Sequence, residues 1–168
     1  VRLAGYFALI AMLAYTVARA DLPFQHASLY YWELGSRFVA SGSFSIRNYN
    51  DGLRGYLFPF LLYLIQAQSA FLSVDAKILF SMYSAIFFAA FTIFLVPWFF
   101  TELLQYRPGP ISRLVFAGLL FYFWRGHFLY PLTDLPALAA GIAAATLWMR
   151  AIRSEMRAYG FILVGVLA

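Results

Sequence analysis

Residues 78–101 form an uninterrupted apolar run without a charged side chain. A helix that crosses the hydrocarbon core of a bilayer needs roughly 17–25 predominantly apolar residues. This run meets that requirement, and an α-helix that is apolar on every side needs lipid or a large protein core around it. The run therefore predicts a membrane-spanning helix.

The composition of the whole chain supports the same interpretation. Of its 168 residues, 64% are apolar and 11% are charged, whereas a soluble domain carries about 25% charged residues. We therefore predict an all-α integral membrane protein with one transmembrane domain over residues 1–168. Because the chain starts at Val1 and its last apolar run is short, we expect it to be the N-terminal part of a longer protein. The predicted spans are 1–19, 77–101, 111–130, 135–152 and 160–168, the last of them truncated.

Cysteine content and charge exclude several classes of site. The chain has no cysteine, so it contains neither a disulfide framework nor a thiolate metal site. Its net charge of +5 comes from basic residues scattered between apolar runs. That pattern is typical of anchoring to anionic lipid headgroups, and we predict a membrane partner and no nucleic-acid partner.

A long polar and aromatic connection, residues 20–55, follows the first predicted span. Within it, residues 26–40 predict an amphipathic helix on the membrane surface, because Tyr31, Leu34 and Phe38 recur at helical spacing. Glu33 and Arg37 are spaced as a favourable i,i+4 pair on another face. A second interfacial helix is predicted over 56–73.

The segment 56–74 decides the topology, and the sequence leaves two alternatives open. If this segment spans the membrane, Asp21 and Asp134 lie on opposite faces; if it lies in the interface, they share one face. Counting basic residues favours the first alternative, with nine of the twelve on the cytoplasmic side, whereas the second splits them six and six. Pro59, Gln66 and Gln68 favour the second alternative, in which the segment lies in the interface, because they make it a mediocre membrane span.

Two acids stand at predicted helix ends. Asp21 follows the first span, where it could pair with Arg19, face water, or hold a cation or a reacting hydroxyl. Asp134 stands where an N-cap residue should, with Pro136 in the first helical turn, so capping alone could account for it. These two are the predicted catalytic residues and, if a metal binds, its predicted ligands.

Basic residues near the same boundary are candidate phosphate ligands. Arg125 lies near the end of a membrane helix and could either reach the headgroups or bind a lipid phosphate with its planar guanidinium. Arg54, between two glycines of the long connection, is a second candidate. His127 is more typical of a boundary histidine than of a metal ligand.

Taken in order, these features resemble the N-terminal module of the glycosyltransferase C superfamily, in particular the polyprenyl-phosphate-sugar transferases related to protein O-mannosyltransferases and lipid A aminoarabinose transferases. The resemblance rests on Asp21 after the first span, the surface helix ending in Ser41-Gly42, the Arg-Gly-Tyr-Leu-Phe-Pro stretch at 54–59, and Thr133-Asp134-Leu135-Pro136 opening a later helix. It implies a multi-span bundle whose long first loop is extracytoplasmic and carries juxtamembrane helices, so that Asp21 and Asp134 face one cavity.

The resemblance also implies an activity. The protein would transfer a sugar from a polyprenyl-phosphate donor to an acceptor hydroxyl with inversion, in the inner (plasma) membrane of a bacterium. Relatives carry their first acid near the position of His26 or Ala27, where this chain has none, so Asp21, Glu33 or Asp51 could take its place as the base. His26, Tyr56, Glu33 and Asp51 join Arg54 and Arg125 as candidate substrate-binding residues.

A divalent cation, Mg²⁺ or Mn²⁺, would bind weakly and together with the donor. Two other functional classes stay open at this point. One is a transporter or flippase of lipid-linked sugars, and the other is a non-catalytic membrane subunit.

Overall fold

The computed structural model describes residues 2–45, 47 and 56–153. Over these residues the prediction of an all-helical chain is confirmed, since they contain helices and connections and no strand. The helices follow in the order α1 (Arg2–Val17), α2 (His26–Ala40), α3 (Leu57–Leu72), α4 (Ala76–Ala90), the π-helical turn η2 (Phe91–Leu95), α5 (Val96–Leu104), α6 (Pro110–Trp124), the 3₁₀ turn η3 (Arg125–Phe128) and α7 (Asp134–Arg153). The predicted run 160–168 lies outside the described residues.

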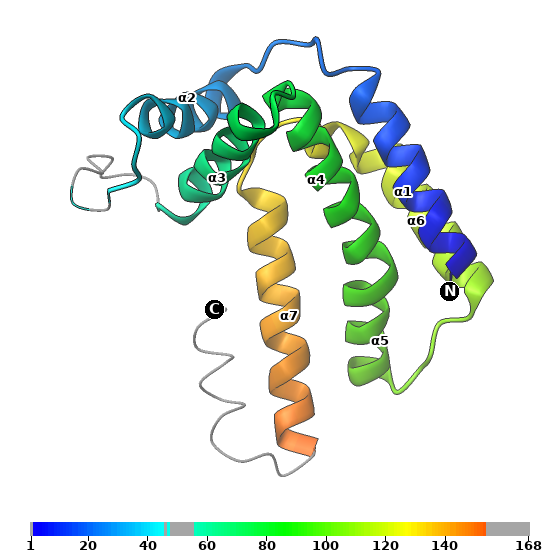
Figure 1. Cartoon of the computed structure of the whole chain (residues 1–168). Coiled ribbons are helices and arrows are strands. Elements are labelled where there is room, and N and C mark those ends of the chain that lie inside the picture. Colours follow the sequence, from blue (N-terminus) through cyan, green and yellow to red (C-terminus); the bar gives the residue numbers. More distant parts are fainter. Residues whose placement is uncertain (1, 46, 48–55, 154–168) are drawn as a thin grey trace.

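The helices form two groups (Figure 1). The first group contains four lengthwise helices that lie beside one another: α1, the long helix formed by α4 and its continuation α5, α6, and α7. Within this group, α1 contacts α4 and α6, and α5 contacts α7. In the second group, α2 and α3 pack together at one end of the first. We call this the Asp21 end, because α1 ends and α7 begins there, and we call the opposite end, where α7 finishes, the Arg153 end.

Within residues 2–45, 47 and 56–153, two helices are long and apolar enough to cross a membrane. They are α4, η2 and α5 taken together, a continuous helix of 29 residues over Ala76–Leu104, and α7 with 20 residues. The α3 helix is apolar but has 16 residues, slightly fewer than a span needs. Length and composition are therefore compatible with a membrane setting for the first group of helices.

A π-helical turn interrupts the long helix just before Pro97. Proline has no backbone N–H, and its ring clashes with the carbonyl group four residues earlier, which here belongs to Ile93. In the turn, the N–H of Val96 donates to the carbonyl of Phe91, five residues back. This wider turn lets the helix continue through Pro97.

The α1 and α4 helices pack closely because small residues line their contact. Ala8 and Thr16, two small residues on α1, are completely or almost completely buried, as is the larger Met12 midway between them. On α4, Ser81 and Ala85 are buried in the same way. Small residues at a helix contact let two backbones approach, as is common in membrane helix pairs.

The α2 helix has the predicted bounds and the predicted inner face. Tyr31 and Leu34 are buried, whereas Glu33 and Arg37 are exposed. After its C-cap residue Ser41, Gly42 has a φ of 74°, a left-handed conformation that glycine adopts without steric cost. The helix therefore ends at the predicted Ser-Gly pair.

Candidate functional site

The two predicted catalytic acids lie at the same end of the molecule. Asp21 is exposed in the turn that follows α1, and Asp134 is exposed as the first residue of α7. The N–H of Ala137 donates to the carbonyl of Thr133 with a distance of 2.9 Å. Thr133 is therefore the residue that precedes the helix, one position earlier than predicted, and the Asp134 side chain is not required as an N-cap.

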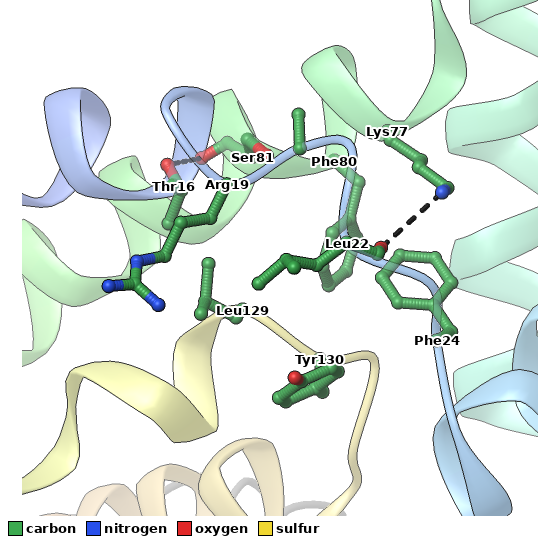
Figure 2. A pocket seen from close by; sticks show the side chains of 10 residues that line it. Thr16, Arg19, Leu22, Phe24, Lys77, Phe80, Ser81, Leu129 and Tyr130 are labelled. Carbon is green, nitrogen blue, oxygen red and sulfur yellow. Dashed lines mark hydrogen bonds between the residues drawn. The ribbon is translucent and has the colours of Figure 1, made fainter.

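A small crevice joins the segments that carry these acids (Figure 2). Arg19, Ala20 and Leu22 line it from the first connection, and Leu129 and Tyr130 line it from the segment that leads to α7. Its volume is about 10 Å³, which is room for about one water molecule. The crevice is thus a contact between two distant segments rather than a place for a substrate.

Aromatic packing fixes the first connection. Phe24 is 8% exposed, and its ring meets those of Trp32, Phe80 and Tyr130 edge to face, with centroids 4.9, 6.0 and 6.4 Å away. Such pairs each add about 0.5–1.5 kcal/mol beyond the area they bury. Phe24 therefore ties the Asp21 segment to α2, to α4 and to the segment before α7.

Two arginines converge on Tyr15, near the end of α1. The guanidinium carbons of Arg19 and Arg125 lie 4.9 and 5.6 Å from the centroid of its ring. Arg125 also donates a hydrogen bond to the carbonyl of Tyr122. Among the described residues neither arginine forms an ion pair, so the alternative in which Arg19 pairs with Asp21 does not occur. Cation–π contacts position both guanidiniums and leave their positive charges without a counter-ion.

Lys77 is a third cation at this end, and the sequence analysis did not select it. Asp75 caps α4, because its carboxylate accepts hydrogen bonds from the N–H groups of Lys77 and Ile78. The ammonium of Lys77 lies 3.4 Å from the carbonyl oxygen of Leu22 and 5.3 Å from the ring centroid of Phe24 (Figure 2). The Asp75-Ala76-Lys77 pattern at a helix start was visible in the sequence, but the contact with Leu22 depends on tertiary packing.

A large apolar cavity opens beside the crevice and shares Phe80 and Tyr130 with it. Its volume is about 390 Å³, which is within the range of small-molecule sites. Leu132, Leu135 and Pro136, which flank Asp134, line one side of it. The remaining lining comes from three further elements: α3 (Phe58, Leu61, Leu62, Leu64, Ile65, Gln68), α4 (Phe80, Tyr83, Ser84, Phe87) and the segment after α6 (His127, Phe128, Tyr130).

Few polar groups reach this cavity. The hydroxyl of Tyr83 donates to Oε1 of Gln68 at 2.6 Å. His127 lies against the ring of Trp124, with centroids 5.3 Å apart, as expected for a boundary histidine. An apolar cavity with a few polar groups at its rim suits a hydrocarbon chain better than a free sugar.

The other predicted substrate-binding residues are more dispersed. His26 opens α2, Glu33 lies along it, and Tyr56 precedes α3, all with exposed side chains. Glu33 and Arg37 form no ion pair; among the described residues, the ion pair found is the one between Arg153 and Glu102. The predicted i,i+4 pair was therefore wrong, because both side chains extend into solvent. Arg54 and Asp51 lie outside the described residues.

The metal prediction rests on Asp21 and Asp134. Within the part of the chain that the structure describes, no group of three or more His, Cys, Asp or Glu side chains lies close enough to hold a metal ion. Mg²⁺ is commonly held by one or two carboxylates together with substrate phosphates. A cation held by Asp21 and Asp134 together with the donor's phosphate stays a prediction, and no step below depends on it.

Comparison of the chain with protein-family models, curated proteins and solved structures found no match.

Proposed function

We propose that this protein is a membrane glycosyltransferase that moves a sugar from a polyprenyl-phosphate donor to an acceptor hydroxyl with inversion at the anomeric carbon. The proposal is carried by three features that lie together at one end of the helices. They are two exposed acids from distant segments, two arginines that form no ion pair within the described part of the chain, and an apolar cavity. Each corresponds to one need of the reaction.

In the proposed reaction, Asp21 is the general base. Its carboxylate takes the proton of the acceptor hydroxyl as the hydroxyl oxygen bonds to the anomeric carbon. The bond between that carbon and the phosphate oxygen breaks, and the polyprenyl phosphate leaves with the electron pair. Asp134 orients the donor sugar on the same side of the site.

The leaving phosphate gains negative charge as the bond breaks. Positive groups already held in place stabilise such charge without reorganising during the reaction. Arg125 and Arg19, oriented by Tyr15, supply this charge, and Arg54 stays the second predicted phosphate ligand from the sequence. Lys77 holds the first connection in place through the carbonyl of Leu22.

The cavity beside Asp134 accommodates the first isoprenoid units of the donor. Its walls are mostly Phe, Leu and Ile side chains, so burial of the donor's apolar chain contributes binding energy of about 25 cal/mol per Å². In this setting α2 and α3 lie at the extracytoplasmic surface of a bacterial inner membrane, and the lengthwise helices cross it.

The test is sugar transfer by the full protein in membranes, with a radiolabelled polyprenyl-phosphate sugar and an acceptor extract. We expect Asp21→Asn to lose transfer and Asp21→Glu to retain part of it. Glu102→Gln is the matched control, because Glu102 is an acid at the Arg153 end. Full activity of Asp21→Asn, with insertion verified, would remove Asp21 from the mechanism and shift the search to Glu33 and Asp51.

One observation favours a flippase of lipid-linked sugars as the second candidate. The π-helical turn lies within the longest helix, as interruptions do in many transporters. However, Phe91, Thr92 and Ile93 of this turn are buried, and the Thr92 hydroxyl donates within its own helix. Movement of a fluorescent lipid-linked sugar across proteoliposomes without release of lipid phosphate would identify a flippase.

A further inference from the structure

A second cavity lies at the Arg153 end, between α5 and α6. Its volume is about 270 Å³, and the α5–α6 connection closes one side of it. Pro97, Phe100 and Leu104 line it from α5, and Phe116 lines it from α6. For comparison, a dry apolar cavity of about 150 Å³ in another protein binds benzene. This cavity can therefore hold a segment of hydrocarbon chain.

One charged side chain, that of Arg113, borders the cavity. The Nε of Arg113 donates to the carbonyl oxygen of Pro108 at 3.1 Å, which orients the guanidinium plane. Among the described residues the side chain of Arg113 has no ion pair and no other hydrogen bond. Its two Nη groups are thus available to a ligand, in the planar arrangement that binds two oxygens of a phosphate.

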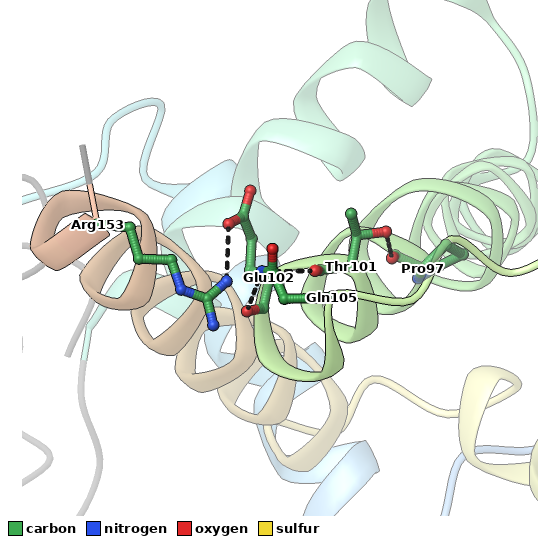
Figure 3. Close-up of polar contacts among 5 residues, drawn as sticks. All are labelled: Pro97, Thr101, Glu102, Gln105 and Arg153. Atoms are coloured by element: carbon green, nitrogen blue, oxygen red, sulfur yellow. Dashed lines mark hydrogen bonds and ion pairs between the residues drawn. The ribbon is translucent and has the colours of Figure 1, made fainter.

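The charges around this cavity are complementary to an anion. Arg107 lies in the connection between α5 and α6, next to Tyr106 and Pro108, which line the cavity. Glu102 is the one acid at this end among the described residues, and its Oε2 lies 3.8 Å from Nη1 of Arg153 (Figure 3). A basic surface at the end of a membrane-length helix attracts anionic headgroups.

We propose that this cavity binds an anionic phospholipid, with one acyl chain between Phe100 and Phe116 and the phosphate on Arg113. A free phosphate would leave the apolar walls without a partner, and a neutral hydrocarbon would leave Arg113 without one. A phospholipid supplies an acyl chain for the apolar walls and a phosphate for Arg113. The proposal requires the membrane setting but not sugar transfer, because the cavity lies at the end of α5 opposite to the Asp21 end.

The test is photo-crosslinking of the full protein in nanodiscs, with phosphatidylglycerol that carries a diazirine in one acyl chain. We expect peptides of the α5–α6 region, 96–116, to be labelled, and the same diazirine on phosphatidylcholine to label them less. Arg113→Gln should lower phosphatidylglycerol labelling about fivefold, the effect of one basic residue near an anionic surface. Ser112→Phe, which places an aromatic ring in the cavity, should reduce labelling with both lipids.

The matched control is Arg107→Gln, which removes the same charge from the same connection but not from the cavity lining. Arg107 belongs to the basic surface but does not line the cavity, so we expect this variant to lose clearly less labelling than Arg113→Gln. Equal losses in the Arg107 and Arg113 variants would mean non-specific attraction and would overturn the site. Equal labelling by the two lipids would overturn it as well. Since the readout is labelling, failure here is distinguishable from failure of sugar transfer.

Discussion

The side-chain amide of Gln66 on α3 donates a hydrogen bond to the backbone carbonyl of Trp32 on α2, with 3.0 Å between the nitrogen and the oxygen. Gln66 is 7% exposed, so this bond forms inside the α2–α3 contact. Gly35, one turn after Trp32, lies against the same part of α3. A polar residue that makes 56–74 a mediocre membrane span thus serves to hold it against α2.

Gly35 lets α2 and α3 approach each other closely, because it has no side chain. A Cβ atom added there would lie 3.2 Å from Cβ of Leu62 and from the backbone N of Tyr63, whereas a Cβ at Gly118 on α6 meets nothing within 4 Å. We expect Gly118→Ala to be neutral or to stabilise by up to about 1 kcal/mol, the propensity gain in a helix. In Gly35→Ala the same propensity gain should be cancelled by crowding against α3. Gly35→Leu should lower the free energy of unfolding by about 1–3 kcal/mol.

Unfolding of the purified protein in detergent measures these differences. Equal effects of alanine at positions 35 and 118 would contradict the close α2–α3 contact.

The hydroxyl of Thr16 contributes little to the contact between α1 and α4. It donates to the carbonyl of Met12 at 2.9 Å and lies 3.4 Å from the carbonyl oxygen of Ser81 on α4. Hydrogen bonds between membrane helices average about 0.6 kcal/mol. Thr92 is a matched control, because it is equally buried and donates only within its own helix.

We expect Thr16→Val to cost about 0.6 kcal/mol more than Thr92→Val in the same unfolding experiment. A difference of several kcal/mol would show that Thr16 has a stronger partner than Ser81.

The Asp21 end should lie on one side of the membrane. Because the chain has no cysteine, single cysteines can be introduced without background. Pro23→Cys and Thr133→Cys should react with an impermeant maleimide from the same side of intact cells, and Tyr106→Cys, in the α5–α6 connection, from the other. Reaction of positions 23 and 133 from opposite sides would eliminate the shared site and with it the proposed mechanism.

Arg125 should depend on its planar guanidinium and not on charge alone. Lysine at this position keeps the charge but loses the planar stacking on Tyr15 and Tyr122 and the two-oxygen grip on phosphate. We expect Arg125→Lys to raise the KM for the donor about tenfold, equivalent to about 1.4 kcal/mol. Arg107→Lys, at the other end of the helices, serves as control. An unchanged KM in the Arg125 variant would mean that the guanidinium contributes to packing and does not bind the donor.

Some of the site could be predicted from sequence and some could not. Asp21 and Asp134 were predicted from their places at the ends of apolar runs and from the resemblance, which implies that both face one cavity. Lys77 was missed, because a lysine in the first turn of a helix is common and its contact with Leu22 joins segments far apart in the chain. Arg19 was considered a partner for Asp21, whereas packing directs its guanidinium to Tyr15.

The sequence by itself determined the helical class and most helix bounds, since apolar periodicity, Ser41-Gly42 and Pro110 act through local backbone geometry. The π-helical turn before Pro97 could have been inferred from the same local rules but was not. Only the tertiary structure decided that α3 lies against α2 and that Asp21 and Asp134 share one end. Counting basic residues favoured the opposite arrangement, because a count sums charges over loops and carries no information on which helix faces fit together. That fit depends on Gly35, Leu62 and Gln66 meeting across the contact.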